Sequence, residues 1–455
     1  MKLNPRRKIA GTITLPGDKS ISHRAALMGL LVDGPLTITN YSDGADCRAT
    51  LEAVKSLGAT VQGDSDNLTI TPADKIVAAD SVIDCGNSGT TARLLAGLLS
   101  GCGVAVELTG DESLRSRPMD RIINPLSEFG AKFDNPSGTL PLKLLGGPVG
   151  AIGATGATGS INYTMPVPSA QVKSALLLAA CAGGGTAIVT EPIATRDHTE
   201  RMLAHLKANI QVSAPRVEIQ DDPHDPRKKT RTVLDNWQSR VTVHGNGKLS
   251  AAAIDIPGDI STAAFFFAAA AIGKGEVTIT NVGLNQTRTA FLEYLKSIGC
   301  AVAIDQRREI SAEPRGRVTV TGAPLKGRKI SGEFSARLID EIPIIATVAC
   351  FAEGPTVIRD VAELRVKESN RLESIASNLR LMGAGVGMID DDGLVIEAKG
   401  EMQPADFKSY GDHRIAMSVA IASLFLSGDS TLDDAECVSV SCPTFFELLD
   451  KIAHG

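Results

Sequence analysis

Apolar and polar positions along the chain repeat in a pattern of helix and strand. Residues 15–40 and 256–281 each read as a Pro-Gly-Asp turn, an apolar helix, a glycine and an alternating strand of Thr and Ile, in the same order and at the same spacing. A repeat on this scale indicates a duplicated supersecondary unit. In the second copy, residues 265–271 (FFFAAAA) are apolar all round, which predicts a helix buried inside a domain.

Looser copies of this unit begin near Cys85, Pro168, Ile339 and Gly411. In most copies a second helix follows, with apolar residues at helical spacing. Five of these second helices reach a residue that favours a left-handed helix cap: Gly58, Gly130, Asn209, Gly299 and Gly383. The pattern therefore predicts six units, each with about 70 to 90 residues of mixed strand and helix.

A chain of 455 residues exceeds what one hydrophobic core usually supports, so two domains are expected. We predict an α/β fold of two similar domains with three units each. Residues 214–239 are polar and rich in breakers, without periodicity, which predicts a linker or surface insertion. The first domain would span residues 18–245 and the second residues 1–17 with 246–455, and the two would face each other across a cleft.

Composition excludes several classes of protein. The longest apolar stretch, residues 262–272, is about half of what a bilayer span needs, and the N-terminus lacks a signal-peptide core. The net charge of −6 argues against bulk nucleic-acid binding, although local basic clusters can still bind small anions. The eight cysteines are scattered and form no metal-binding motif, which indicates reduced thiols in a cytoplasm. We therefore expect a cytoplasmic protein without metal, nucleic acid or membrane partners.

The first motif with candidate chemistry is residues 17–24 (GDKSISHR), at a turn that opens a helix. Lys19, Ser20 and Arg24 would surround the helix N-terminus, where free N–H groups and the helix dipole favour phosphate. The alternative is a Ser-capped helix with solvated charges. In the matching copy, however, Ile260 and Phe265 replace Lys19 and Arg24 while the turn and helix persist. The scaffold does not need these charges, which favours a functional role.

Three further motifs occur in the first half, and each has a structural alternative. Residues 87–90 (NSGT) bring backbone N–H groups close to an anion, or only cap a helix. Arg117, before Pro118, is in a loop where an arginine is usually solvated. Residues 169–173 (SAQVK) supply hydroxyl and amide groups at a helix start, and residues 195–200 (TRDHTE) read either as a functional segment or as a capping segment with incidental charges.

The second half adds three motifs. In residues 339–343 (IDEIP), Asp340 is either a functional carboxylate or a helix cap. Residues 364–371 (LRVKESNR) hold more charge than a typical solvated face, and we expect positions 367, 368 and 371 to share a helical face. Residues 411–414 (GDHR) place another arginine at a helix start, and His413 is predicted as a local hydrogen-bonding residue because no partner has metal-ligand spacing.

Together these motifs closely resemble the 5-enolpyruvylshikimate-3-phosphate synthase family. Seven motifs occur in the family's order and span nearly the whole chain: Gly17–Arg24, Gly86–Thr90, Arg117-Pro118, Ser169–Gln171, Asp340, Leu364–Glu368 with Arg371, and Asp412–Arg414. The resemblance implies an inside-out α/β barrel fold of two domains, each built from three βαβαββ units, with the active site in the cleft between them. It also implies transfer of the enolpyruvyl group of phosphoenolpyruvate to the 5-hydroxyl of shikimate 3-phosphate, with release of phosphate.

The resemblance assigns roles to matching positions. Shikimate 3-phosphate would contact Lys19, Ser20, Arg24, Ser169, Ala170, Gln171, Arg196, Asp340 and Lys367. Phosphoenolpyruvate would contact Lys19, Gly89, Arg117, Gln171, Arg371 and Arg414. Asp340, Glu368 and Lys19 would be catalytic: Asp340, assisted by Lys367, takes the hydroxyl proton and Glu368 protonates the methylene carbon. Two positioned carboxylates suffice for this chemistry, so no cofactor is expected. Active sites in this family lie within one chain, which predicts a monomer.

The sequence departs from the family pattern at three places. Val440 stands where many relatives have a lysine, Asn370 stands where Asp is frequent, and residues 214–239 look longer and more polar than usual. Two alternatives to this family remain open. The sister transferase that uses UDP-N-acetylglucosamine has the same fold, but usually Lys-Asn after its first turn. A non-catalytic repeat scaffold would repeat its charges from unit to unit, whereas here they differ.

Overall fold

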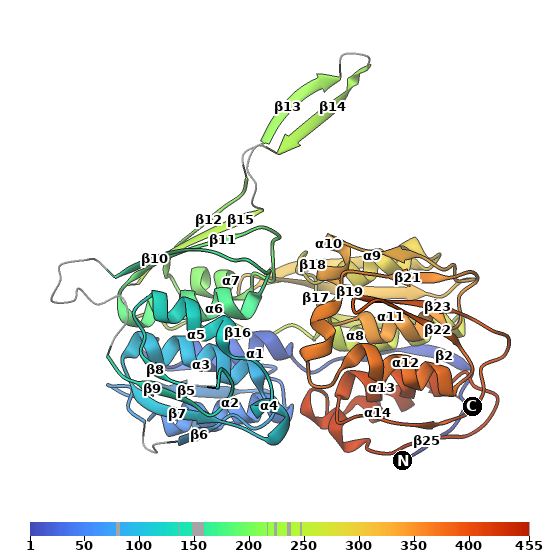
Figure 1. Cartoon of the computed structure of the whole chain (residues 1–455), viewed down its shortest axis with the longest axis horizontal. Helices are drawn as coiled ribbons and strands as arrows, with labels where there is room; N and C mark the ends of the chain where they lie inside the picture. The colour runs from blue at the N-terminus through green and yellow to red at the C-terminus, as the bar shows by residue number, and fades with distance from the viewer. Residues whose placement is uncertain are drawn as a thin grey trace.

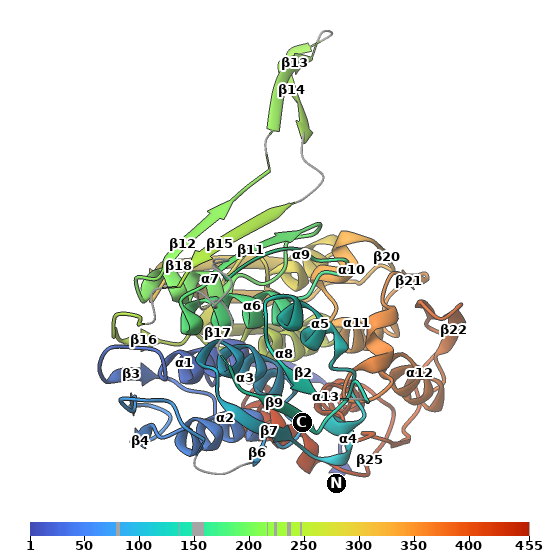
Figure 2. The same cartoon turned by 60° about the vertical axis from the view of Figure 1, so that its left-hand side comes forward.

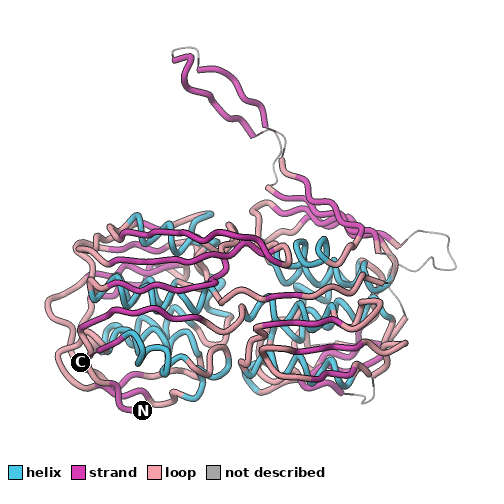
Figure 3. Tube along the Cα trace, turned by 180° about the vertical axis from the view of Figure 1, so that it is seen from behind, coloured by secondary structure: helices cyan, strands magenta, loops and turns pink. Residues whose placement is uncertain are grey.

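The chain folds into two rounded domains that lie side by side (Figure 1). The computed structural model describes residues 1–78, 82–135, 137–147, 159–215, 217–222, 225–233, 238–245 and 248–454. Seen from behind, helices fill the interior of each domain and strands form its outer faces (Figure 3). The predicted α/β fold of two domains is confirmed. Each helix in the described ranges is too short or too polar to span a membrane.

One strand order recurs in both domains. In the first domain, β6 (Val82–Asp84) is parallel to β7 (Ala105–Thr109), which pairs antiparallel with β9 (Leu142–Leu145), and β9 pairs antiparallel with β8 (Phe133–Asp134). Two more sheets repeat this order: β16 (Ile254–Asp255), β3 (Leu36–Thr39), β5 (Leu68–Thr71) and β4 (Thr60–Gln62), and then β10 (Ser160–Thr164), β11 (Thr186–Glu191), β15 (Ser239–His244) and β12 (Asn209–Ser213).

The second domain has the same arrangement of strands. Its sheets are β20 (Lys329–Ile330), β21 (Thr356–Ile358), β23 (Gly393–Glu397) and β22 (Gly385–Ile389); β2 (Lys8–Thr14), β17 (Glu276–Gly283), β19 (Glu313–Thr321) and β18 (Ala301–Ile310), with β26 (Ala453–His454) beside β2; and β24 (Asp406–Phe407), β25 (Ser430–Leu432) and β1 (Lys2–Leu3). Since the parallel pair followed by antiparallel strands recurs, the repeat predicted from the sequence is present in both domains.

The chain passes between the domains twice, and the two passing segments are bonded to each other. Strand β2, near the N-terminus, pairs with β17 in the second domain, and the chain then passes to the first domain. Strand β16 still pairs with β3 in the first domain, and the chain passes back to the second domain after it. Between these strands Asp18 N donates to Pro257 O at 2.8 Å, and Asp259 N donates to Pro16 O at 3.1 Å. A Cβ at Gly17 would lie 1.7 Å from Asn40 O, so only glycine permits this close approach.

The apolar helices predicted from the repeat are the cores of the domains. In the first domain α1 (Lys19–Met28), α3 (Gly89–Cys102) and α6 (Ala170–Gly183) pack together, and in the second α8 (Ile260–Gly273), α11 (Ile342–Ala349) and α13 (His413–Ser423) do the same. Each is surrounded by buried aliphatic side chains of its own domain. Burial on all sides explains why these helices are apolar all round.

Amphipathic helices lie around these cores (Figure 2). They are α2 (Ala45–Ser56), α5 (Asp120–Glu128), α7 (His198–His205), α9 (Ala290–Ser297), α12 (Arg371–Leu381) and α14 (Phe445–Ile452), with the short helices α4 (Glu112–Arg115), α10 (Glu333–Arg337), η1 (Ala362–Val366) and η2 (Glu436–Val440). The four glycines predicted as helix caps, Gly58, Gly130, Gly299 and Gly383, all have positive φ. The predicted cap at Asn209 is wrong, because Asn209 begins β12.

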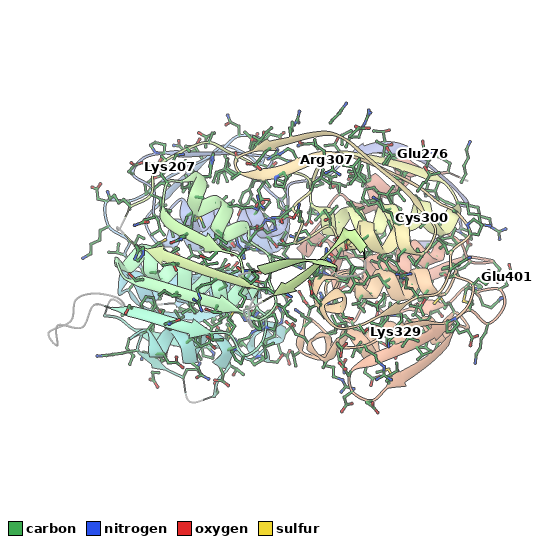
Figure 4. The ribbon with its side chains drawn as sticks, turned by 90° about the horizontal axis from the view of Figure 1, so that it is seen from above. Lys207, Glu276, Cys300, Arg307, Lys329 and Glu401 are labelled. Atoms are coloured by element: carbon green, nitrogen blue, oxygen red, sulfur yellow. The ribbon has the colours of Figure 1, made fainter. Side chains whose placement is uncertain are left out.

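The left-handed residue that follows α7 is Lys207, with φ 62°. The amide of Ala208 donates to Leu203 O at 2.8 Å and that of Lys207 to Ala204 O at 3.1 Å, so the chain turns two residues earlier than the apolar spacing suggested. Viewed from above, Lys207 lies on the first domain, and the labelled Glu276 and Glu401 lie on the second (Figure 4).

The segment predicted as a linker forms a hairpin of the first domain. Strands β13 (Val217–Asp222) and β14 (Asp225–Val233) pair antiparallel and project away from the sheet that contains β12 and β15 (Figure 1). Residues 216, 223–224 and 234–237 of this segment lie outside the described residues. The hairpin joins two neighbouring strands of one sheet, so the prediction of an interdomain linker here is wrong, whereas a surface insertion is confirmed.

The exact division between the domains stays a prediction. Leu249, Ile254 and Ile256 pack in the core of the first domain, while Ile260 packs in that of the second. We propose that the division falls between Ile256 and Ile260 rather than at residue 245, because the second passage between the domains occurs there.

Candidate active site

Motifs far apart in the sequence lie together where the two domains meet. Among the interactions that join the domains there, Arg196 is ion-paired with Asp340, Ser113 Oγ lies 3.4 Å from Glu368 O, and Arg121 Nη1 lies 3.4 Å from Glu363 Oε1. A pocket at the same boundary is lined by residues of both domains, among them Lys19, Ser20, His413 and Arg414. The structure thus places charged groups of both domains around one space.

Helix α1 opens on two of the predicted residues, Lys19 and Ser20. Its cap is Asp18, whose carboxylate accepts from Ile21 N at 3.0 Å, so the alternative of a Ser-capped helix is wrong. The Lys19 ammonium is ion-paired with Asp46 of α2. Burial disfavours the charged form, but the Asp46 carboxylate outweighs it and raises the pKa of Lys19, so this residue is a cation at neutral pH.

The third residue of this motif, Arg24, is buried beneath Ser20. Its guanidinium donates to Ser20 O at 2.9 Å, to Ser174 Oγ at 2.9 Å and to Thr199 Oγ1 at 2.7 Å. Burial lowers the pKa of Arg24 to about 10, which leaves it charged at neutral pH. Its contacts with α6 and α7 show that Arg24 ties the start of α1 to the neighbouring helices.

The Ser-Ala-Gln motif lies at the start of α6. The Ser169 side chain caps this helix by accepting from Val172 N at 3.4 Å, and Ala170 is the first helical residue. The Gln171 amide accepts from Arg93 at 3.1 Å and donates to Thr90 Oγ1 at 3.1 Å. Gln171 therefore joins the first turns of α3 and α6.

Several arginines gather at the start of α3. Arg117 is buried, which rules out the solvated alternative, and it donates to Asn87 Oδ1 at 2.7 Å and to Ser113 Oγ at 3.0 Å. A Cβ on Gly89 would lie 2.7 Å from Arg93 Nη1 and 3.5 Å from Arg117 Nη1. Buried guanidinium groups next to a helix that begins with glycine form a site for an anion.

Part of this arginine cluster lacks partners. Among the described residues, the buried Nε atoms of Arg93, Arg117 and Arg121 have no hydrogen-bond acceptor. Burial, together with the charges of Arg121 and Arg117, lowers the pKa of Arg93 to about 9. Both observations show an excess of positive charge that a bound anion would neutralise.

Asp340 is surrounded by arginines. Besides its pair with Arg196, its carboxylate lies 3.6 Å from Arg371 Nη1 and 4.0 Å from Arg414 Nη2. Burial opposes ionisation, but these cations outweigh it and hold the pKa of Asp340 well below its usual value. The cap alternative is wrong, because α11 begins at Ile342 without a side-chain cap.

Glu368 forms an ion pair with Arg371 at 2.7 Å. Arg371 is itself buried and held by Asp412, with Nε 2.7 Å from Asp412 Oδ2. Burial opposes ionisation of Glu368, but Arg371 and other nearby basic groups outweigh it and lower its pKa well below the usual value. The site therefore holds two ionised carboxylates, Asp340 and Glu368, which share contact with one buried arginine.

Residues 367–370 are not helical, so the prediction of a shared helical face is wrong. Helix η1 ends at Val366, Lys367 is extended, and α12 begins at Arg371 after its cap Asn370, which accepts from Glu373 N at 3.4 Å. An Asp-like capping role explains why Asn is suited to position 370. The Lys367 ammonium contacts Glu363 at 2.8 Å.

Helix α13 completes the second-domain side of the pocket. Its cap is Asp412, and Arg414 Nη1 donates to Asp340 O at 2.8 Å. His413 is buried beside Lys19, and both its burial and that ammonium lower the pKa of His413 to about 3. His413 is consequently neutral at neutral pH.

Comparison with known proteins shows one family along nearly the whole chain. The sequence model of EPSP synthase (3-phosphoshikimate 1-carboxyvinyltransferase) matches residues 3–236 and 229–449. The chain belongs to the EPSP synthase family. Its relatives include a 3-phosphoshikimate 1-carboxyvinyltransferase of Geobacter sulfurreducens, 42% identical over 456 residues, which cover 99% of this chain and 98% of that one. A second, from Bacillus velezensis, is 40% identical over 459 residues and covers 100% and 99%.

A solved EPSP synthase from Acinetobacter baumannii has a similar structure. It aligns with a TM-score of 0.80 and 36% sequence identity, covering 99% of this chain and 98% of that one. The family resemblance seen in the sequence, the predicted fold class and the predicted enzyme activity are thereby confirmed: the chain is a 3-phosphoshikimate 1-carboxyvinyltransferase. The family that matches is therefore neither the sister transferase that uses UDP-N-acetylglucosamine nor a non-catalytic repeat scaffold.

Sequence reasoning missed three charged residues of this EPSP synthase site: Arg93, Arg121 and Glu363. Arg93 lies four residues after Gly89, on the same face of α3, and that helical spacing is a signal available in the sequence. Arg121 and Glu363 carry no such signal, because their pairing depends on how the two domains meet.

The first departure from the family pattern, Val440, lies at the site. It ends η2, and a Cβ at Gly44 would lie 2.7 Å from its carbonyl oxygen, so this segment of the second domain rests against the first. The next residue, Ser441, lines the pocket, and its buried Oγ has no partner among the described residues. The place of the family's usual lysine is therefore beside the pocket.

Proposed function

We propose that this EPSP synthase binds shikimate 3-phosphate and phosphoenolpyruvate together at the domain boundary, and that the residues predicted from the sequence carry out the transfer. The observation that supports this proposal most is the gathering of cations from both domains around two carboxylates, Asp340 and Glu368. Two phosphates and two carboxylates bring about five to six negative charges into the site. Paired arginines from both domains neutralise them with fixed geometry.

Shikimate 3-phosphate would bind mainly to the first domain. The starts of α1 and α6 present Lys19, Ser20, Ser169, Ala170 and Gln171, and the helix dipoles favour its negative charge there. Arg196 would take the phosphate. Arg24 would act from below, because its guanidinium holds the carbonyl of Ser20. Asp340 and Lys367 would reach the substrate from the second domain.

Phosphoenolpyruvate would bind between the arginine cluster and the second domain. On one side are Gly89, Arg117 and Gln171, to which the structure adds Arg93. On the other side, Arg371 and Arg414 would bind its acidic groups, with Lys19 between the two substrates. The backbone of Gly89 leaves the space that a side chain would fill, so this anion would lie directly on the first turn of α3.

The chemistry would proceed through an addition followed by an elimination. Glu368 gives a proton to the methylene carbon, which makes the neighbouring carbon electrophilic. The 5-hydroxyl attacks that carbon and gives up its proton to Asp340, forming a tetrahedral adduct. Phosphate leaves by cleavage of the C–O bond, and the Glu368 carboxylate takes back a methyl proton, which restores the double bond. Lys19, as a cation beside both substrates, would stabilise the negative charge that moves to the leaving phosphate.

Substrate charge would prepare both carboxylates for these roles. In the free protein Asp340 is ion-paired with Arg196, and Glu368 is ion-paired with Arg371. The phosphate of shikimate 3-phosphate would replace Asp340 at Arg196 and free that carboxylate to accept a proton. The negative groups of phosphoenolpyruvate would neutralise Arg371 and Arg117, and Glu368 would then hold a proton more readily.

Three finer predictions join this proposal. We infer a monomer, because the described site is built from residues of one chain, and a cytoplasmic location, because its eight cysteines are free thiols, as is usual in a reducing compartment. We also infer that glyphosate competes with phosphoenolpyruvate for the space at Gly89, since it occupies that site in this family. Competition is tested by inhibition kinetics at several phosphoenolpyruvate concentrations, and the monomer by light scattering.

The central test is phosphate release with both substrates together and with each alone. Release only with both, lost in Lys19→Ala and Asp340→Ala but retained in Lys55→Ala, supports the proposed site, because Lys55 is an exposed lysine on the outer helix α2. Release with UDP-N-acetylglucosamine instead of shikimate 3-phosphate would contradict the proposed substrate. Full activity in Asp340→Ala would contradict the proposed base.

A further inference from the structure

A buried polar cluster lies next to the active site, where the chain passes between the domains. It comprises Asp18, His198, Asp259, Ser261, Arg288 and Glu313, all of which are buried. His198 belongs to α7 of the first domain, while Arg288 and Glu313 belong to the second. Of residues 195–200, which include His198, only Arg196 has a role in the proposed function.

The contacts of His198 define its protonation. Its Nδ1 lies 2.7 Å from Glu313 Oε1, and its Nε2 lies 3.0 Å from Arg288 Nη1. A guanidinium only donates, so Nε2 accepts and the single proton is on Nδ1, from which it is donated to Glu313. Burial lowers the pKa of His198 to about 3, in agreement with this neutral tautomer.

Arg288 extends the cluster to the starts of two helices. Its Nη1 donates to Asp18 Oδ2 at 3.2 Å and its Nη2 to Ser261 Oγ at 2.8 Å, and it lies 3.6 Å from Asp259 Oδ1. Asp18 caps α1 and Asp259 caps α8. Arg288 thus contacts both caps, and Lys19 and Ser20 immediately follow one of them.

We propose that His198 is a positioning residue for shikimate 3-phosphate. His198, at the start of α7, contacts Glu313 and Arg288 of the second domain, and Arg288 also contacts Asp18, the cap of α1. These contacts hold the starts of α7 and α1 in one arrangement relative to each other. Arg196 precedes the first of these helix starts, and Lys19 and Ser20 form the second. The inference rests on the proposed function, in which these three residues bind the substrate.

A role in stability alone explains this arrangement less well. Buried ionic groups are costly to desolvate, and apolar residues of similar size usually stabilise a core at least as well. A fully hydrogen-bonded network, by contrast, gives helix ends one defined position. Arg288 orients the capping carboxylate of the helix that presents Lys19, so a shift of His198 would move substrate ligands without touching the substrate.

Two substitutions separate the two contacts of His198. In His198→Asn the side-chain amide occupies the position of Nδ1 and keeps the bond to Glu313, but nothing reaches Arg288. In His198→Gln the amide oxygen reaches the position of Nε2 and keeps the bond to Arg288. Steady-state kinetics, calorimetric binding of shikimate 3-phosphate and thermal unfolding are measured for both, with His205→Ala at the other end of α7 as the control.

We expect His198→Asn to raise KM and Kd for shikimate 3-phosphate about tenfold, since small misplacements of binding groups cost up to about 100-fold. His198→Gln should stay within about threefold of the wild type, and KM for phosphoenolpyruvate should change less in both variants. Unchanged KM and Kd in folded His198→Asn, or equal effects of the two variants on both substrates, would overturn the proposal. Arg196→Ala tests the proposed function separately: an unchanged KM there refutes the phosphate site and not the link through His198.

Discussion

Asp340 and Arg196 belong to different domains, yet they form an ion pair at the centre of the site. Both are proposed ligands of shikimate 3-phosphate, one for the reacting hydroxyl and the other for the phosphate. The carboxylate of Asp340, the proposed base, is therefore paired with the Arg196 guanidinium to which the substrate phosphate would bind. Binding would exchange one anion for another at Arg196, which limits the gain in affinity and leaves Asp340 without its strongest partner.

The first prediction concerns this exchange. In Asp340→Asn the competing carboxylate is absent, so shikimate 3-phosphate should bind at least as tightly as to the wild type, while turnover falls by about 100-fold or more, as expected on loss of a general base. Calorimetry gives the dissociation constant and phosphate release gives the rate. Much weaker binding with little loss of rate would show that Asp340 is a substrate ligand and not the base.

A second prediction concerns Gly89. Its substitution by alanine places a Cβ 2.7 Å from Arg93 Nη1, so the guanidinium must move from its contacts with Gln171 and the Pro118 carbonyl. We expect KM for phosphoenolpyruvate to rise about tenfold, since one lost charge-assisted hydrogen bond costs about 1.5–3 kcal/mol. KM for shikimate 3-phosphate should change little. Thermal unfolding serves as the control, because alanine suits a helix start and the fold should persist.

The third prediction concerns the pair of Arg121 and Glu363 across the domain boundary. Both side chains are about one-third exposed, at 33% and 34%, so solvent screens the interaction. A double-mutant cycle of Arg121→Ala and Glu363→Gln should give a coupling energy of about 0.2–1 kcal/mol in thermal or denaturant unfolding. Salt should reduce it further. A coupling of several kcal/mol would show that this pair holds the domains together and is not a marginal surface contact.

Much of the fold could be predicted because the repeat leaves its marks at fixed positions. The Pro-Gly-Asp turns at Gly17 and Gly258 are the two points at which the chain passes between domains, and they form a bridge to each other. At Gly17 the close backbone approach requires glycine. The cap at Asn209 could not be located, because Lys207 adopts the left-handed conformation despite its side chain. Local propensity does not reveal where tertiary pairing ends a helix.

The site was less accessible from the sequence than the fold. Motifs identified the helix starts that carry Lys19 and Gly89, since small and polar residues at such positions are a local signal. Arg121 and His198 find their partners, Glu363 and Glu313, on the other domain, and no local pattern encodes these contacts. The charges of residues 367–371 resemble a helical face, whereas α12 begins only at Arg371, after its cap Asn370.

A fourth prediction follows from Glu313, which packs beside His198. Burial, reinforced by the Asp197 carboxylate, raises the pKa of Glu313 to about 8, above its unfolded value. A carboxyl with a raised pKa adds stability that is present below the unfolded pKa and is lost as pH rises through about 8. The free energy of unfolding of the wild type should therefore fall between about pH 4.5 and pH 8, relative to Glu313→Gln. The slope is at most about 1.4 kcal/mol per pH unit. Parallel pH profiles of the two proteins in denaturant unfolding would contradict this.

The last prediction concerns the proton that Glu368 must supply. In the free protein Arg371 and nearby basic groups hold the pKa of Glu368 well below its usual value, so the group is ionised at neutral pH and cannot yet donate. Phosphoenolpyruvate would bring negative charge to those same cations and remove their effect on Glu368. The pKa of Glu368 should rise on binding, and the ternary complex should take up a proton from the buffer.

Proton uptake is measured by calorimetry in buffers of equal pH and different ionisation enthalpy. To keep chemistry from interfering, phosphoenolpyruvate is titrated into Asp340→Asn already saturated with shikimate 3-phosphate. The uptake should disappear when Glu368→Gln is added to this background, because glutamine does not titrate. Uptake that persists with Glu368→Gln would place the titrating group elsewhere. No uptake in either protein would mean that Glu368 stays ionised beside Arg371. The proton for the methylene carbon would then have to come from another donor at this site, such as the Lys19 ammonium that lines the pocket.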